Sequence, residues 1–307
     1  MSAFILRRLA ATVPVLIGVT VIAFALSLAL PGGPAAASLG VKATQEQIDA
    51  ERRRLGLDAS VHVQYVRFWS GLLAGRIRSY QSGRPVTELI GRALPVTFLI
   101  TLGAMIIAIL LGLVLGFGAA ARPGGLADGA AMGAATLGLS VPVFWWAMIL
   151  VAIFSVWLGW FPPSLYERGS FRHLVLPSIA LGTIFAAAIA RLTRASVIDA
   201  MHEPYVRAAR ARGAGGARVL VAHAGANAML PVVTVIGTNF AGLLTGAVLT
   251  ETVFSLPGLG QLMYNAIDAQ DYNLLMAAIA TAALVFVLVN LVVDVAYAWL
   301  DPRIRYA

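Results

Sequence analysis

The chain has 307 residues, of which 60% are hydrophobic and only 12% are charged, and its mean hydropathy is +0.85. A soluble domain cannot bury that much apolar surface, so the composition excludes a soluble protein and predicts an integral membrane protein. The net charge of +8 does not indicate nucleic-acid binding, because the arginines lie at the ends of long apolar runs, where they set membrane topology.

Several kinds of chemical site are excluded by residues that the sequence lacks. There is no cysteine, which excludes disulfides, thiolate metal sites and cysteine nucleophiles, and the four histidines show no metal-binding spacing. The one lysine, Lys42, precedes Ala43, whereas a phosphate-binding P-loop needs Gly-Lys followed by Ser or Thr. We therefore expect no metal and no cofactor in this chain, and any ATP that drives it must bind to another polypeptide.

Six apolar runs are long enough to cross a bilayer as helices, which takes about 17–25 residues. The first run favours a membrane span over a cleaved signal peptide, because it is longer than the typical signal-peptide apolar core of about 7–15 residues. The alternative is cleavage after this run, where Ala35-Ala36-Ala37 resembles a cleavage site. The fold class is therefore an all-α integral membrane protein with about six transmembrane helices. The runs are Leu9–Leu30, Ala93–Ala121, Gly129–Trp157, Leu174–Ala190, a run within Val219–Thr250 that we expect to begin at Pro231, and Tyr272–Val293.

A polar segment separates the first run from the second. Thr44 and Gln47 form a capping-box pattern that predicts a short helix, which Gly56 can close. Apolar side chains then recur at helical spacing and predict a second helix. This helix either lies in the membrane interface, which Tyr and Trp prefer, or packs on the rest of the domain. Its spaced residues are Val61, Tyr65, Phe68, Trp69 and Leu72.

Pairs of glycines four residues apart predict close helix packing within three of the runs. Small residues at this spacing let two helix backbones approach each other closely. The pairs are Gly112 with Gly116, Gly129 with Gly133, and Gly242 with Gly246.

A charged stretch separates the fourth run from the fifth. Pro204 suits the first turn of a helix, because its missing N–H would be unpaired there, and Gly213 can take the left-handed conformation that ends a helix. Glu203 lies at the positive end of the helix dipole, and Arg210 and Arg212 lie at the negative end. The pattern predicts a short, basic, well-capped helix from Pro204 to Arg212.

The distribution of arginines predicts the topology. Cytoplasmic loops are enriched in Lys and Arg, and six spans place both termini on one side. With cytoplasmic termini, the two short outer loops hold only Arg168 and Arg172. The chain then divides into an N-terminal transmembrane helix at 1–30, an extracytoplasmic insert at 31–95 and a five-helix core at 96–307 with a cytoplasmic loop at 197–230. The inner arginines are Arg7, Arg8, Arg122, Arg191, Arg194, Arg207, Arg210, Arg212, Arg218, Arg303 and Arg305.

Two acidic residues lie at the ends of apolar runs. A carboxylate at mid-bilayer costs about 2.5–3.5 kcal/mol on insertion scales, so such residues are often functional. Asp294 precedes Pro302 by eight residues, near the inner end of its helix, where water or an arginine can reach it, and we expect a structural role. Glu251 ends the fifth run on the outer side, where it can lie inside the membrane or equally at the membrane–water interface.

Motifs spread over nearly the whole chain point to one family. Residues 205–213 read YVRAARARG, with Arg207 where the general motif has Glu. This stretch resembles the EAA loop of the permease subunits of dipeptide/oligopeptide ABC importers. Four further motifs resemble other signatures of the same family, and they follow the family's order along the chain. The sequence departs from the family pattern at Gly75-Arg76, where an acidic Gly-Asp pair is usual. The further motifs are Tyr80–Val86, Leu139–Trp145, Glu251–Gly260, and Leu300–Tyr306 with Asn290, Asp294 and Tyr297.

The resemblance implies a type I ABC-importer permease fold in the bacterial inner (plasma) membrane. It implies a second homologous permease subunit that shares the translocation pathway, cytoplasmic ATPase subunits that bind ATP-Mg, and an extracytoplasmic substrate-binding protein. The chain itself is then a non-catalytic subunit, most in keeping with di- or oligopeptide cargo, although related permeases carry nickel, glutathione or haem. The residues expected to meet the ATPase are Tyr205, Arg207, Ala208, Ala209, Arg210, Ala211, Arg212 and Gly213.

Two other classes of protein find less support in the sequence. A self-contained secondary transporter or channel needs ionisable residues near the bilayer centre or broken helices with internal symmetry, and neither stands out. A membrane enzyme needs a nucleophile–base pair or a metal motif, and no such pattern is present. The sequence therefore favours an importer subunit that receives its energy from a partner.

Overall fold

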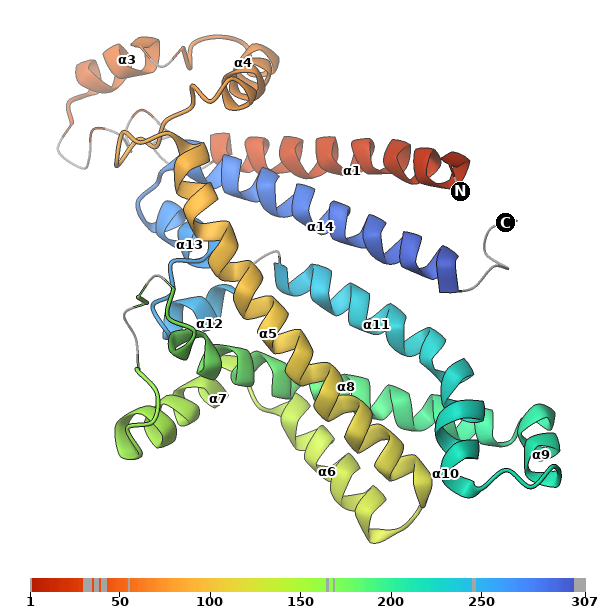
Figure 1. Cartoon of the computed structure of the whole chain (residues 1–307). Helices are drawn as coiled ribbons and strands as arrows, with labels where there is room; N and C mark the ends of the chain where they lie inside the picture. The colour runs from red at the N-terminus through yellow and green to blue at the C-terminus, as the bar shows by residue number, and fades with distance from the viewer. Residues whose placement is uncertain are drawn as a thin grey trace. The chain divides into compact units, whose positions relative to one another are not determined.

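The described part of the chain is built from helices (Figure 1), which confirms the all-α fold class. Among the described residues, the one β-bridge pairs Arg78 with Pro85. The helices belong to two compact units: the first holds Met1–Thr97, Leu244–Val248 and Pro257–Ala307, and the second holds Phe98–Leu243 and Leu249–Leu256. The computed structural model describes residues 2–29, 35, 39, 43–54, 56–163, 166–167, 169–244 and 247–300.

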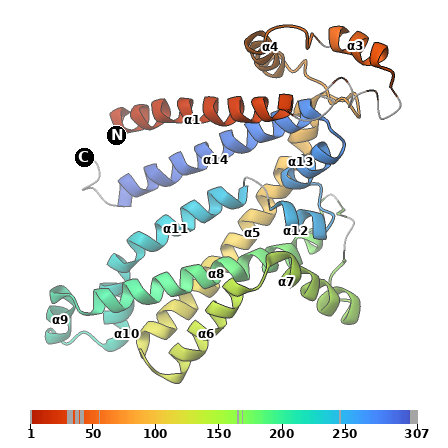
Figure 2. The same cartoon turned by 180° about the vertical axis from the view of Figure 1, so that it is seen from behind.

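In the first unit, the first and last helices lie side by side. Both cartoon views show α1 (Ser2–Ala29) running along α14 (Tyr272–Leu300) (Figures 1 and 2). α13 (Leu259–Asp268) packs against α14, so residues from opposite ends of the sequence form one core. The predicted boundary of an isolated N-terminal helix therefore separates segments that are in contact in three dimensions.

The insert contributes α3 (Gln45–Arg54) and α4 (Val61–Leu73). The expected capping box is present: the Thr44 N–H donates to Gln47 Oε1 at 2.9 Å, and the Gln47 N–H donates to Thr44 Oγ1 at 3.4 Å. Gly56 has a φ of +66°, the left-handed conformation expected of a residue that ends a helix.

The apolar face of α4 packs on the first unit. Phe68 is buried in a core shared with α13 and α14, and Trp69 and Leu72 pack against that core. The Tyr65 hydroxyl forms a hydrogen bond of 2.8 Å with Thr20 Oγ1 on α1. Packing within the unit therefore accounts for the helical spacing of these side chains.

A buried carboxylate holds the end of the insert in place. Asp271, which is 1% exposed, accepts a hydrogen bond of 2.5 Å from Ser79 Oγ and longer ones from the N–H groups of Gln81 and Leu274. Burial raises the pKa of Tyr80 to about 12, and the negative charge of Asp271 adds to the effect. The loop with the Tyr80 motif is thus attached to the residues directly before α14.

The second unit contains most of the remaining helices, and α5, α11 and α12 each have residues in both units. These helices are α5 (Val86–Ala121), α6 (Leu126–Ser140), α7 (Val143–Leu150), the π-helical η1 (Val151–Trp157), α8 (Arg172–Met201), α9 (Pro204–Ala211), α10 (Gly216–Arg218), the π-helical η2 (Val219–Gly225), α11 (Ala226–Leu244) and α12 (Val248–Val253).

Four helical stretches of the described residues are long and apolar enough to cross a membrane, and a bent pair supplies a fifth if it counts as one span. α1 adds a shorter apolar segment, Ala10–Ala25. The four long stretches are Val86–Ala121, Arg172–Met201, Gly216–Leu244 and Tyr272–Val295.

The third apolar run is not one continuous straight helix. It bends by 105° between α6 and α7. Val141 takes an extended conformation (φ −87°, ψ 126°) because the ring of Pro142 disfavours helical backbone in the preceding residue. Pro142 then serves as the N-cap of α7. The break falls inside the Leu139–Trp145 motif.

The fifth run begins earlier than Pro231, where we expected it to start. A continuous helical stretch begins at Gly216 and passes through η2, so that Pro231 lies inside α11. An internal proline removes one backbone donor, here the partner of the Asn227 carbonyl, and membrane helices tolerate such a loss where other groups replace it. The described α11 ends at Leu244, and Glu251 lies on α12 with its side chain fully buried rather than at an exposed interface.

The first glycine pair packs as predicted. A Cβ atom on Gly112 would lie 2.7 Å from Ile189 Cβ, and one on Gly116 would lie 2.6 Å from Thr193 Cβ, so only hydrogen fits between α5 and α8. In the described part of the chain the second pair does not pack against another helix, because no heavy atom beyond its own helix backbone lies within 4 Å of such a Cβ on Gly129 or Gly133.

The third glycine pair is described only in part. Gly242 also has open space around it, and Gly246 lies outside the described residues.

The close approach of α5 and α8 makes a specific prediction. Gly116→Val should lower the free energy of unfolding by about 1–3 kcal/mol, because the added methyl groups overfill the contact with Thr193. Gly118→Val is the matched control on the same helix, since Gly118 has no heavy atom within 4 Å of the added Cβ. The measurement is the thermal midpoint of detergent-solubilised protein; equal midpoints for both variants would contradict the packing.

Candidate coupling site

The basic helix α9 forms where the sequence predicts it. α8 ends at Met201, and His202 is its C-cap. The next residue, Glu203, is extended (φ −67°, ψ 149°) because a proline follows it, so the helix cannot continue. Pro204 then occupies the first helical turn, and Arg212 is the C-cap. A proline therefore both stops the long α8 and starts the short α9.

The end of α9 is closed by a Schellman motif. Gly213 has a φ of +86°, its N–H donates to the Arg210 carbonyl at 2.9 Å, and the Ala214 N–H donates to the Ala209 carbonyl at 3.2 Å. These bonds satisfy carbonyls that the helix end would otherwise leave unpaired. The short helix is thus terminated by its own backbone.

One face of α9 is anchored in the second unit. Val206 is 0% exposed and Ala209 is 2% exposed, and residues three apart lie on the same side of a helix. Val206 joins a core that draws on α5, α8, η2 and α11, so a displacement of α9 must move or deform those helices. The other buried members of this core are Ala120, Val197, Ala200, Val219, Ala224 and Ala228.

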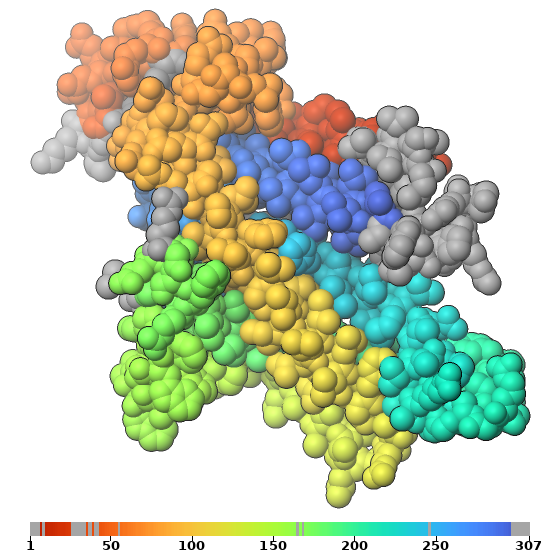
Figure 3. Space-filling model, in the orientation of Figure 1, coloured from red at the N-terminus to blue at the C-terminus, as the bar shows by residue number. Residues whose placement is uncertain are grey.

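The opposite face of α9 is exposed, and in the space-filling view α9 lies at the surface of its unit (Figure 3). Ala209 is the exception among the predicted contact residues: it faces the core of its own chain, so its burial does not fit the expectation that it meets a partner. The exposed members of the predicted site are Tyr205, Arg207, Ala208, Arg210, Ala211, Arg212 and Gly213.

Two of the exposed arginines reach back to the end of α8. Arg207 Nη2 donates to the His202 carbonyl at 3.4 Å, and Arg210 Nη2 lies 3.8 Å from Met201 Sδ. Positive charge near a helix C-terminus is favourable, because the carbonyl end of the helix dipole is negative. The basic surface is therefore held against α8 before any partner is present.

An ion pair that the sequence reading missed lies between α6 and α8. Both guanidinium nitrogens that face Asp128 donate to it: Arg194 Nε at 2.5 Å and Nη2 at 2.7 Å. The Gly124 N–H also donates to Asp128 Oδ2 at 2.8 Å. From the sequence alone, Arg194 contributes only to the prediction of topology. The one available hint was that Asp128 is the only acid between Glu88 and Glu167.

A polar face on α11 was also missed. Between Ala226 and Leu244, all described, no large apolar side chain is exposed. The polar character was not visible as a pattern because the residues are spread over four turns among apolar neighbours. The polar face, as we call it, consists of Asn227, Pro231, Thr234, Thr238 and Gly242.

The second unit offers a direct contrast on α5. There the exposed side chains at four-residue spacing are large and apolar, as expected for a surface that meets lipid tails. They are Phe98, Leu102, Ile106, Leu110 and Val114.

Asp294 lies on α14 in the first unit and is partly buried. With Asn290 and Thr12 it lines a cavity of about 230 Å³ between α1 and α14. The position is compatible with the expected structural role. Of the C-terminal motif that includes Asn290 and Asp294, residues 301–306 lie outside the described residues.

Comparison with known proteins identifies the family. A family model described as the binding-protein-dependent transport system inner membrane component matches residues 108–306, and the model of the corresponding N-terminal region matches residues 1–101. The chain belongs to this family. It is therefore a membrane permease subunit of an ABC importer and a multi-pass inner-membrane protein.

The permease resembles curated relatives over its full length. It is 40% identical to the di/tripeptide transport system permease protein DppB of Pseudomonas aeruginosa, with 100% of this chain and 99% of that protein covered. It is also 40% identical to the glutathione transport system permease protein GsiC of Salmonella paratyphi A, with 99% of each covered.

A solved structure supports the fold. The permease matches a chain of the inward-facing MetNI methionine ABC transporter with a TM-score of 0.58. The match covers 71% of this chain and 98% of that chain at 17% identity, so the likeness concerns the fold alone.

The Schellman motif generates a prediction about the end of α9. Gly213→Ala should destabilise this end by about 1–2 kcal/mol, because a Cβ is strained in the left-handed conformation even though open space surrounds it. Gly215→Ala is the matched control, since Gly215 also has open space but a φ of −67°. Amide hydrogen exchange across 204–216 should accelerate only in Gly213→Ala, and unchanged exchange there would contradict the assigned role.

Proposed function

We propose that this permease imports di- or oligopeptides together with a second homologous permease subunit, cytoplasmic ATPase subunits and an extracytoplasmic substrate-binding protein. The cargo follows from the full-length similarity to permeases named for di/tripeptides and for glutathione, which is itself a tripeptide. The family description supports dependence on a binding protein.

The anchored α9 carries the proposed coupling mechanism. Its exposed arginines suit an acidic surface on the ATPase, and its small side chains Ala208 and Ala211 permit close helix contact. Movement of the ATPases is then passed by Val206 into the core that includes α5, α8 and η2. ATP and magnesium bind to the partner subunits in this mechanism, and this chain supplies no catalytic group.

The proposed mechanism requires α9 in the cytoplasm, with both termini on the same side and the insert outside. The concentration of arginines in and around α9 supports this orientation. An ATPase has access to α9 only in that arrangement.

We assign the polar face of α11 to the translocation pathway. Lipid tails do not hydrogen-bond, so the exposed amide of Asn227 is poorly suited to a lipid-facing surface. The Thr234 and Thr238 hydroxyls donate to the Leu230 and Thr234 carbonyls at 3.2 and 2.9 Å, and their oxygens can still accept hydrogen bonds from water. The carbonyl of Asn227 also lacks its helical donor at Pro231, and water can supply one. The face carries no charge, so it suits a hydrated passage that does not select cargo by net charge.

The coupling proposal is tested with single cysteines, which is straightforward because the chain has none. In the assembled importer, Ala208→Cys should crosslink to the ATPase subunit, because Ala208 is exposed on α9. Ala209→Cys is the matched control and should crosslink much more weakly, because residue 209 is 2% exposed. Mass spectrometry of the products identifies the neighbour; the absence of an ATPase crosslink from Ala208→Cys contradicts the proposal.

The pathway proposal is tested by cysteine accessibility in the assembled importer. Thr238→Cys should react with a membrane-impermeant methanethiosulfonate, since thiolates form readily only in contact with water. Leu110→Cys, on the apolar exposed face of α5, should remain unreactive. Equal reactivity at both positions, or protection of residue 238, would show that the polar face does not line a hydrated passage.

A further inference from the structure

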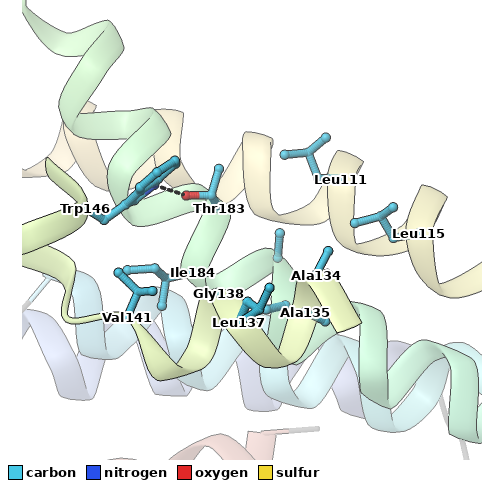
Figure 4. Close-up of a pocket in the computed structure, with 12 residues that line it drawn as sticks. Leu111, Leu115, Ala134, Ala135, Leu137, Gly138, Val141, Trp146, Thr183 and Ile184 are labelled. Carbon is cyan, nitrogen blue, oxygen red and sulfur yellow. Dashed lines mark hydrogen bonds between the residues drawn. The ribbon is translucent and has the colours of Figure 1, made fainter. Parts of the chain in front are cut away.

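The second unit contains an apolar cavity of about 380 Å³ in the angle between α6 and α7 (Figure 4). Leu111 on α5, Gly138 on α6 and Val141 at the break line it together with residues of α8. Leu111 is 42% exposed and Leu137 is 69% exposed, so the cavity opens to the outside of the unit between α5 and α6. The 105° bend at Val141-Pro142 leaves this space beside α8.

The polar side chains that line the cavity are already paired with each other. Trp146 Nε1–H donates to Thr183 Oγ1 at 2.9 Å, as Figure 4 shows, and the Thr183 hydroxyl donates to the Ile179 carbonyl at 2.8 Å. Apolar cavities of this kind remain free of water, because a water molecule needs two or more polar partners. Peptide cargo is disfavoured for the same reason, since its amide groups would lose their hydrogen bonds.

The cavity lies at the depth of the hydrocarbon core. Thr183 is the twelfth residue of the 30-residue α8, roughly 17 Å from its start at 1.5 Å per residue. The hydrocarbon core of a bilayer is about 30 Å thick, so the middle of a spanning helix meets lipid tails rather than headgroups. Acyl chains are therefore the molecules at hand where the cavity opens.

We propose that this cavity binds one acyl chain of a membrane phospholipid. The chain packs against Trp146, Leu111 and Ile184 and fills space that would otherwise forfeit dispersion contacts. It thereby supports the bend between α6 and α7, which has no ordinary helix hydrogen bonds across Pro142. The inference depends on the membrane location of the permease, and it is independent of the cargo and of the coupling role of α9.

The test measures contact between Trp146 and brominated lipid, which quenches tryptophan fluorescence on contact. The assembled importer is placed in nanodiscs of phosphatidylcholine brominated at mid-chain, and the contribution of Trp146 is taken as the difference from a Trp146→Phe importer. Gly138→Leu fills the cavity; its Cβ would lie 3.6 Å from Ala187 Cβ, an ordinary contact, so the variant should fold. We expect strong quenching of Trp146 and the loss of most of it in Gly138→Leu.

A control and two other quenching results complete the test. Trp145, the preceding residue in the sequence, is 49% exposed and is not among the residues that line the cavity, so its own quenching should be unaffected by Gly138→Leu. Quenching of Trp146 by aqueous iodide would mean that the cavity holds water. Protection from both quenchers would mean that a helix of a partner subunit covers it. Either result, or bromolipid quenching that Gly138→Leu leaves unchanged, overturns the proposal.

Discussion

The buried contact of Val206 is the interaction on which the proposed coupling of this permease to its ATPase depends. A short helix of eight residues is marginal by itself, because helix nucleation is costly and few hydrogen bonds repay it. α9 persists because Val206 and Ala209 are buried, and because a proline and a left-handed glycine define its ends. The same burial that stabilises the helix also ties it mechanically to α5, α8 and η2.

The proposed coupling through α9 also requires that the helices packed behind it form a rigid group. Between α5 and α8 this stiffness comes from close packing of backbones, since Gly112 and Gly116 leave no room for a side chain. The ion pair of Asp128 with Arg194 joins α6 to α8. Thus α8, the helix that leads directly into α9, is held by packing on one neighbour and by charge on another.

The exposed faces of the helices differ in their chemistry. α5 presents large apolar side chains, whereas α11 presents hydroxyls, an amide and glycine. The cavity between α6 and α7 is a third case, a concave apolar surface whose polar side chains are paired internally. In a membrane protein, such differences in exposed chemistry separate surfaces for lipid, for water and for cargo, because a bilayer offers no hydrogen bonds.

The sequence by itself determined the membrane class, the helical content, and the position and ends of α9. These follow from local rules: apolar run length, the restriction of backbone before proline, and the freedom of glycine at positive φ. The restriction of backbone before proline also predicts the break at Val141-Pro142, but the length of the apolar run led us to expect one continuous span there. At Pro231 we predicted the start of a helix where the structure has a continuous one, because a proline inside a membrane helix and one at its start look alike in sequence.

Only the tertiary structure decided which side of each helix is buried and which distant residues meet. Asp128 pairs with Arg194, and Ser79 donates to Asp271, 192 positions away. Ala209 is buried in the core of its own unit. No local sequence pattern encodes contacts between such distant residues. The glycine pairs make the same point. Gly112 and Gly116 pack closely against α8, whereas Gly129 and Gly133 face open space. The four-residue spacing permits a close contact, but the contact forms only where a second helix passes over the glycines.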